Sequence, residues 1–127
     1  MPNQGHIAVD LDGTLASFNG WHGPEHIGLP VPVMLERVKQ WLKNGIEVKI
    51  FTARACIPEY VPYVKQWLKD NGLPDLEVTN KKDFSTLEIW DDIAVGIIPN
   101  SGKPKLARDV EACYAATVSA VAFSSSE

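Results

Sequence analysis

Hydrophobic positions along the chain follow two periodicities in turn, one typical of helices and one typical of strands. Apolar side chains recur at helical spacing in VPVMLERVKQWLKNG (31–45) and in PEYVPYVKQWLKDNG (58–72), and each segment ends in a glycine. Short runs rich in apolar and β-branched residues predict strands at 7–9, 46–52, 76–79 and 87–90. Strands that alternate with helices of about a dozen residues form βαβ units. The pattern therefore predicts an α/β, three-layer, Rossmann-like fold with a mostly parallel central sheet covered by helices on both faces.

The last quarter of the chain, from residue 94 on, has a weaker pattern. The run AVGII (94–98) is a candidate further strand, the alanine-rich stretch 103–123 predicts a C-terminal helix, and 124–127 predicts a frayed tail. The segment VKQWLKNG (38–45) nearly recurs as VKQWLKDNG (64–72). We attribute the likeness to the same packing requirements on two helices of one sheet; the alternative is an ancient duplication. We expect the 127 residues (1–127) to form a single domain.

Composition and charge exclude some classes of function. The chain is 45% hydrophobic and 22% charged, with 12 basic and 16 acidic residues and a net charge of −4. The basic residues are scattered, which argues against broad, non-specific binding to nucleic acids or anionic membranes. No segment has the roughly 18 consecutive apolar residues of a membrane span, and the first residues lack the pattern of a secretory signal. We therefore expect a cytoplasmic protein with no membrane partner.

The two cysteines fit that location. Cys56 and Cys113 form no CxxC pair and lie far apart in the sequence. We expect both to be small buried hydrophobes rather than a disulfide or metal site, in a reducing compartment.

Each predicted strand is followed by polar residues. In chain order these are Asp10 and Asp12, then Thr52, then Thr79 and Asn80 before Lys81 and Lys82, then Asp91 and Asp92. In parallel sheets, ligands bind at the carboxyl ends of the strands, where these residues would meet. Asp10 and Asp12 would share one side of a continuing strand and repel each other, so the pair requires a cation or a chemical task.

The ordered motifs DLDGTLA (10–16), IFTAR (50–54), a downstream lysine and IWDD (89–92) resemble the haloacid dehalogenase-like superfamily of magnesium-dependent phosphatases and phosphotransferases. The resemblance covers roughly residues 6–98, and its specific element is D-x-D-G-T after an apolar run. Cap insertions usually lie between the first motif and the threonine strand or between that strand and the lysine, and each of these intervals holds only one helix, which implies minimal or no cap domain. The chain departs from the usual pattern where Asp83 replaces a proline after the lysine and where Ile93 replaces a basic residue after the acids.

The resemblance implies a covalent mechanism. Asp10 would be the nucleophile that forms an aspartyl-phosphate, and Asp12 would protonate the leaving oxygen and then deprotonate the attacking water. Mg²⁺ would be held by Asp10, the backbone carbonyl of Asp12 and Asp91, with Asp92 as a further ligand, directly or through water.

Thr52 and a lysine would contact the phosphoryl group, and the resemblance favours Lys82 over Lys81 for that lysine. The alternative for Thr52 is a helix N-cap without a ligand. Two interpretations of Arg54 stay open: a forked contact with a substrate phosphate or carboxylate, or an ordinary surface ion pair.

The loop after the first motif holds three more candidates. His22 and His26 lie four apart, but Gly23-Pro24 between them interrupts a helix, which favours solvated residues or substrate contacts over a zinc pair. Trp21 either stacks on a substrate ring or anchors the loop. Elsewhere, we expect His6 to be structural, and Trp41 and Trp67 to belong to the core. After the third strand a helix or turn should begin around Asp83-Phe84, with Phe84 facing the core.

These features together predict a magnesium-dependent phosphomonoester hydrolase. The alternatives are a phosphotransferase or nucleic-acid-end phosphatase, and a non-catalytic phosphate- or nucleotide-binding module on the same fold. Asp12 disfavours the binding module, because a site that only holds metal needs no acid/base carboxylate. The expected partner is a phosphorylated substrate, either a small molecule or a nucleic-acid end, and the oligomeric state stays open.

Overall fold

A computed structural model describes residues 5–105 of the chain. The chain divides into two compact units, Met1–Asp92 and Ile93–Glu127. Most of the second unit lies outside the described residues, so the single domain over 1–127 stays a prediction.

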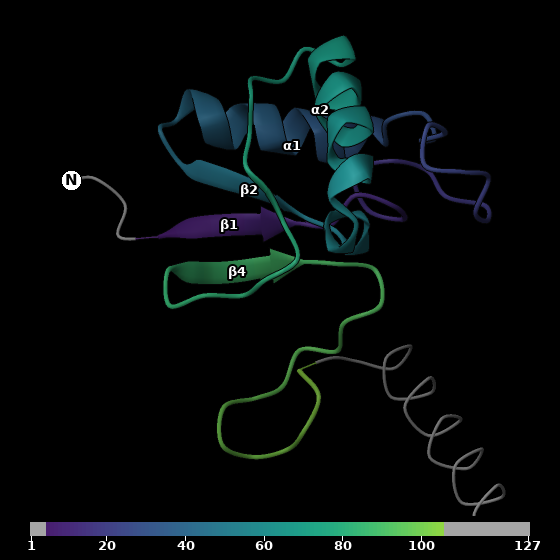
Figure 1. The fold of residues 1–127 in the computed structure, drawn as a ribbon. Helices are drawn as coiled ribbons and strands as arrows, with labels where there is room; N and C mark the ends of the chain where they lie inside the picture. Colours follow the sequence, from purple (N-terminus) through teal and green to yellow (C-terminus); the bar gives the residue numbers. More distant parts are fainter. Residues whose placement is uncertain (1–4, 106–127) are drawn as a thin grey trace, which may run out of the picture. The chain divides into compact units, whose positions relative to one another are not determined.

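The first unit is an α/β fold built on a parallel sheet (Figure 1). The four strands lie in the order β3-β2-β1-β4, and every neighbouring pair is parallel. The strands are β1 (His6–Val9), β2 (Glu47–Phe51), β3 (Val78–Thr79) and β4 (Thr86–Trp90). The helical segments are α1 (Pro32–Lys43), the 3₁₀ turns η1 (Ala53–Cys56) and η2 (Pro58–Tyr60), and α2 (Val61–Asp70). This architecture confirms the predicted α/β, Rossmann-like class with a parallel sheet.

Helices α1 and α2 cover the same face of the sheet (Figure 1). This follows from the strand order, because β1, β2 and β3 step in one direction and crossovers between parallel strands are right-handed. The core lies between these two helices and the sheet. There Ile7 and Val48, which are paired across β1 and β2, pack with Val38 of α1 and Val64 of α2. Residues 5–105 thus show two of the three predicted layers, with no α-helix on the other face of the sheet. Of the predicted C-terminal helix 103–123, residues 106–123 lie outside the described residues.

Strand β3 is shorter than the predicted strand 76–79. It contains only Val78 and Thr79, which pair with Ile50 and Phe51 of β2. The carbonyl of Leu76 accepts a hydrogen bond from Lys65 Nζ at 2.7 Å. Leu76 is buried, but its carbonyl bonds to a side chain of α2 and the residue lies outside the strand.

Three other predictions from the sequence are wrong. Phe84 is fully exposed rather than facing the core, because Asp83 Oδ1 accepts from Ser85 N at 2.8 Å and closes a turn that leaves residue 84 outside. Cys56 is exposed rather than buried, and its sulfur accepts from Asn80 Nδ2 at 3.2 Å. Segment 94–98 forms no strand, since only an isolated bridge joins Ile97 to Pro104. Cys113 and the tail 124–127 lie outside the described residues.

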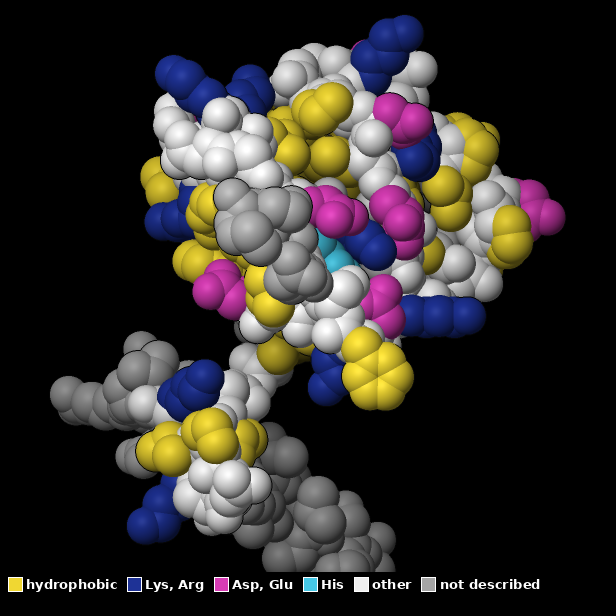
Figure 2. Space-filling view, turned by 90° about the vertical axis from the view of Figure 1, so that its left-hand side faces the viewer, with side chains coloured by type: hydrophobic (Ala, Val, Ile, Leu, Met, Phe, Trp, Pro, Cys, Tyr) yellow, Lys and Arg dark blue, Asp and Glu magenta, His cyan; other side chains and the backbone are white. Residues whose placement is uncertain are grey.

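The structural roles of His6 and two tryptophans are confirmed. His6 is buried, with Nδ1 at 3.1 Å from Ser85 Oγ and Nε2 at 3.2 Å from Thr86 Oγ1. Trp67 is 9% exposed, and Trp41 packs against the core. Figure 2 views the amino-terminal ends of the strands, where acidic, basic and hydrophobic side chains of the first unit are interspersed. Within residues 5–105, neither helix has the length and apolarity that crossing a membrane requires.

Candidate functional site

Strands β1 and β4 bring three carboxylates together at the carboxyl edge of the sheet. Asp10 follows β1, and Asp91 and Asp92 follow β4. The strands are direct neighbours, and the Asp10 N–H donates to the carbonyl of Trp90 at 2.9 Å. One carboxylate oxygen from each aspartate lies within 4.8 Å of those of the other two. These three aspartates, which we call the acidic triad, are therefore close enough to share one cation.

The acidic triad disfavours a charge on Asp10. Burial, then a hydrogen bond to Asp92 and the negative charge of Asp91, raise the pKa of Asp10 to about 8. A divalent cation between the three carboxylates would displace the proton and offset the repulsion. Carboxylate oxygens are the ligands that Mg²⁺ prefers, so the donor set fits that ion.

A tight loop after β1 shapes this edge. Leu11 and Leu15 are fully buried and fix the loop to the core, and the Leu11 carbonyl accepts from Ala16 N at 2.8 Å. Gly13 has a φ of +90°, which L side chains rarely adopt, and a Cβ there would collide with the Asp92 carboxylate. Glycine is therefore the residue that lets the loop approach Asp92 closely.

We expect Gly13→Ala to weaken the response of the protein to Mg²⁺. The methyl group must displace Asp92, and the positive φ adds about 1–2 kcal/mol of strain. Thermal unfolding measured with and without Mg²⁺ checks this expectation. Gly45→Ala is the matched control, because Gly45 has a φ of +80° but a Cβ there meets nothing within 4 Å. Equal Mg²⁺-induced shifts in Tm for the two variants would contradict the placement of Asp92 in the cation site.

The side chain of Asp12 is held by Arg54. Arg54 Nε donates to Asp12 Oδ2 at 2.7 Å, and Nη2 donates to Oδ1 at 2.9 Å, which makes a two-pronged pair. The same guanidinium donates to the carbonyls of Pro24 and His26, each at 3.0 Å. Arg54 is only 5% exposed, so the surface ion-pair interpretation is wrong. Its direct contact with a substrate stays a prediction.

Arg54 also contacts Trp21, an aromatic residue of the loop 17–30. Its guanidinium carbon lies 4.7 Å from the ring centre of Trp21, and Trp21 stacks on Tyr60 at 5.8 Å. Trp21 therefore helps to anchor the loop, as one of the two interpretations expected. His22 and His26 are both exposed, with ring centres 5.3 Å apart, and belong to no metal-ligating group of three or more within residues 5–105.

Thr52 directly follows β2 and precedes η1, which contains Arg54. It is buried, and its hydroxyl oxygen accepts from Arg54 N at 3.2 Å, so Thr52 caps η1. A hydroxyl that accepts one hydrogen bond still carries its own proton, so capping is compatible with the predicted contact to a phosphoryl oxygen.

Both lysines after β3 are exposed. The backbone N–H of Lys81 donates to Thr79 Oγ1 at 3.1 Å, which fixes the start of the loop. The choice between Lys81 and Lys82 stays a prediction.

Sequence reasoning missed three groups in this region. Thr14 Oγ1 donates to Asp10 Oδ2 at 3.2 Å, and the carbonyls of Pro24 and His26 hold Arg54. The D-x-D-G-T spacing contained a signal for Thr14, four residues after Asp10. Nothing in the pattern of residues 17–30 indicates which carbonyls turn toward Arg54.

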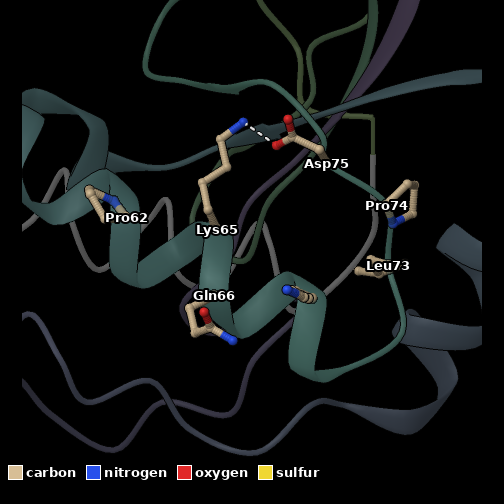
Figure 3. Close-up of a pocket in the computed structure, with 7 residues that line it drawn as sticks. Pro62, Lys65, Gln66, Leu73, Pro74 and Asp75 are labelled. Atoms are coloured by element: carbon tan, nitrogen blue, oxygen red, sulfur yellow. Dashed lines mark hydrogen bonds and ion pairs between the residues drawn. The ribbon is translucent and has the colours of Figure 1, made fainter.

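A surface hollow lies elsewhere, between α2 and the loop that follows it (Figure 3). Two of its polar side chains are paired with each other: Lys65 Nζ donates to Asp75 Oδ1 at 2.7 Å, and also to the Leu76 carbonyl. The lining residues are Pro62, Lys65, Gln66, Lys69, Leu73, Pro74 and Asp75. None of the predicted site residues is among them.

Comparison with known proteins supports the fold and assigns no family. No protein-family model matches the chain, and no curated protein matches it. The chain is similar to a solved structure described as a conserved protein from Bacteroides thetaiotaomicron, with 26% sequence identity and a TM-score of 0.55. The match covers 75% of this chain and 81% of the other. That description states no activity, so the similarity bears on the architecture alone.

Proposed function

We propose that this protein is a magnesium-dependent phosphomonoester hydrolase similar to the haloacid dehalogenase-like superfamily, in a form with minimal or no cap. The observation that supports it best is the acidic triad at the carboxyl edge of a parallel sheet, with Asp12 held separately by Arg54. A site that only bound metal would not require a fourth carboxylate fixed by a buried arginine. The resemblance of motifs 10–16, 50–54 and 89–92 supports the same proposal.

The proposed reaction has two displacements. A carboxylate oxygen of Asp10 attacks phosphorus, the bond from phosphorus to the ester oxygen breaks, and Asp12 gives that oxygen a proton. Asp12 then removes a proton from water, whose oxygen attacks phosphorus, releases inorganic phosphate and restores Asp10. Bound at the acidic triad, Mg²⁺ would supply positive charge that reduces repulsion between the carboxylates and the phosphate. Thr52 and Lys82 would donate hydrogen bonds to the phosphoryl oxygens.

The proposal is tested by incubating the full chain with a generic aryl phosphate and Mg²⁺. We expect steady turnover with Mg²⁺ and none in excess chelator. Ca²⁺ should not replace Mg²⁺, because it takes six to eight looser oxygen ligands and would draw Asp10 off the line of attack. Full activity in chelator would overturn the metal assignment.

Two other functions fit parts of the site. A phosphotransferase or nucleic-acid-end phosphatase would use the same residues, and phosphorylated metabolites assayed beside oligonucleotides with 3′- or 5′-phosphates would identify it. A binding module on the same fold would give no turnover with any phosphate in that panel.

The two lysines after β3 give a further prediction. We expect Lys82→Ala to lower kcat/KM by the equivalent of about 2–4 kcal/mol, because a lysine beside the transferring phosphoryl group stabilises its charge. Lys81→Ala should cost well under about 1 kcal/mol, as for an exposed peripheral charge. The two variants are compared at matched thermal stability. A larger loss at Lys81 would show that the phosphate-contacting lysine is one position earlier.

A further inference from the structure

The loop 17–30 holds an exposed indole beside the predicted acid/base. Trp21 is 52% exposed, whereas the core residue Trp67 is 9% exposed. The guanidinium that lies 4.7 Å from the Trp21 ring centre is the one that bonds Asp12 at 2.7 Å. A single arginine side chain therefore separates the indole from the Asp12 carboxylate.

The loop that carries Trp21 is fixed from several sides. Arg54 binds the carbonyls of Pro24 and His26, and Trp67 Nε1 donates to the Gly28 carbonyl at 2.8 Å. Gly28 packs so closely on Ser17 that a Cβ would collide with the Ser17 carbonyl. The ring is thus held at a defined place while half of its surface faces solvent, which lowers the entropic cost of binding a ligand against it.

A second ring, the half-buried Tyr60, supports Trp21. Tyr60, at the end of η2, stacks on Trp21 with ring centres 5.8 Å apart and planes inclined by 28°. The two nearly parallel rings come from different connections of the sheet, β1 to α1 and β2 to α2. The part of the Trp21 ring that stays exposed is flat and aromatic, which suits a flat aromatic group rather than an aliphatic chain.

Asp12 determines which part of a substrate would reach these rings. In the proposed function, on which this inference rests, Asp12 protonates the leaving oxygen, so the leaving group emerges beside Asp12 and Arg54. We propose that Trp21, held in place by Tyr60 and Arg54, is a stacking platform for an aromatic base in the leaving group, and that the substrates are nucleoside monophosphates. Trp21 is then a specificity-determining residue.

The experiment compares two substrates that differ by the base alone, adenosine 5′-monophosphate and ribose 5-phosphate, with Mg²⁺ and the full chain. Stacking on an aromatic side chain typically changes affinity by about fivefold to a hundredfold per base. We expect wild-type kcat/KM to favour the nucleotide by about that factor, Trp21→Ala to remove most of the preference, and Trp21→Phe to keep part of it. Phe18→Ala is the matched control, because Phe18 is 51% exposed in the same loop.

Ribose 5-phosphate has no base, so its hydrolysis distinguishes two roles of Trp21: stacking on a base and positioning Arg54. If Trp21→Ala lowered kcat/KM for both substrates equally, Trp21 would act only by positioning Arg54, and the platform would be overturned. A wild-type enzyme without preference for the nucleotide would overturn it as well.

Binding measured by calorimetry covers the case in which neither compound is hydrolysed. Tighter binding of adenosine 5′-monophosphate than of ribose 5-phosphate, lost in Trp21→Ala, would then support the platform while the hydrolase proposal fails. Equal binding of the two compounds would overturn the platform too.

Discussion

Replacing Asp10 with asparagine is expected to abolish phosphatase turnover while the fold is retained. The amide is nearly isosteric with the carboxylate but cannot attack phosphorus effectively, and loss of a covalent nucleophile commonly costs several powers of ten in rate. The fold should survive, because a neutral amide of nearly the same shape adds no charge to a place where burial and the neighbouring carboxylates disfavour one. The measurements are kcat/KM with Mg²⁺ and the circular dichroism spectrum.

Asp75→Asn is the matched control, since Asp75 is 84% exposed at its side chain and lies in the hollow beside α2. It should retain wild-type activity. An Asp10→Asn variant that kept more than about a hundredth of wild-type activity would show that Asp10 is not the nucleophile.

Removal of the Arg54 side chain is expected to lower the free energy of unfolding far more than removal of a charge from an exposed ion pair. Arg54→Ala leaves Asp12 and the carbonyls of Pro24 and His26 without their donors, and breaking a buried ion pair from one side costs about 3–5 kcal/mol of unfolding free energy. Arg54→Lys should recover only part of this energy, because an ammonium cannot make the two-pronged contact. Urea unfolding of the variants measures both effects.

The exposed pair between Lys65 and Asp75 provides a reference on the same molecule. Asp75→Asn should cost less than about 1 kcal/mol, as for other surface pairs. A double-mutant cycle with Asp12→Ala then isolates the coupling between Arg54 and Asp12. If Arg54→Ala cost no more than Asp75→Asn, or if the cycle gave no coupling, Arg54 would not be the residue that fixes Asp12.

The periodicity of apolar residues predicted the helices well, because each helix buries only one of its faces. Helices α1 and α2 appear close to the predicted ranges, because their apolar residues recur at 3.6-residue spacing and pack on one sheet face. Strand β3 was predicted too long because Leu76 is apolar and buried, yet buried apolar residues also occur in loops. Phe84 shows the opposite error: its hydrophobicity suggested the core, but the turn made by Asp83 decides its position.

The carboxylates of the site were predictable because the strand ends place them. Once β1 and β4 are neighbours and parallel, Asp10 and Asp91 must meet at one edge of the sheet. The partner of Asp12 could not be found in this way, because Arg54 is positioned by carbonyls of a loop that has no periodic pattern. Such a loop adopts its conformation through contacts distant in sequence, which a local pattern does not encode.

The anchors of the loop 17–30 also bear on how the protein matures during synthesis. Arg54 follows Asp12 by 42 positions, and Trp67 follows Gly28 by 39. A nascent chain that has completed β1, α1 and β2 already contains Asp10 and Asp12, yet it lacks Trp67, which holds the loop at Gly28. The arrangement of Asp12, Arg54 and the loop 17–30 can therefore form completely only after α2 has docked, and the acidic triad is complete later still, when β4 brings Asp91 and Asp92 beside Asp10.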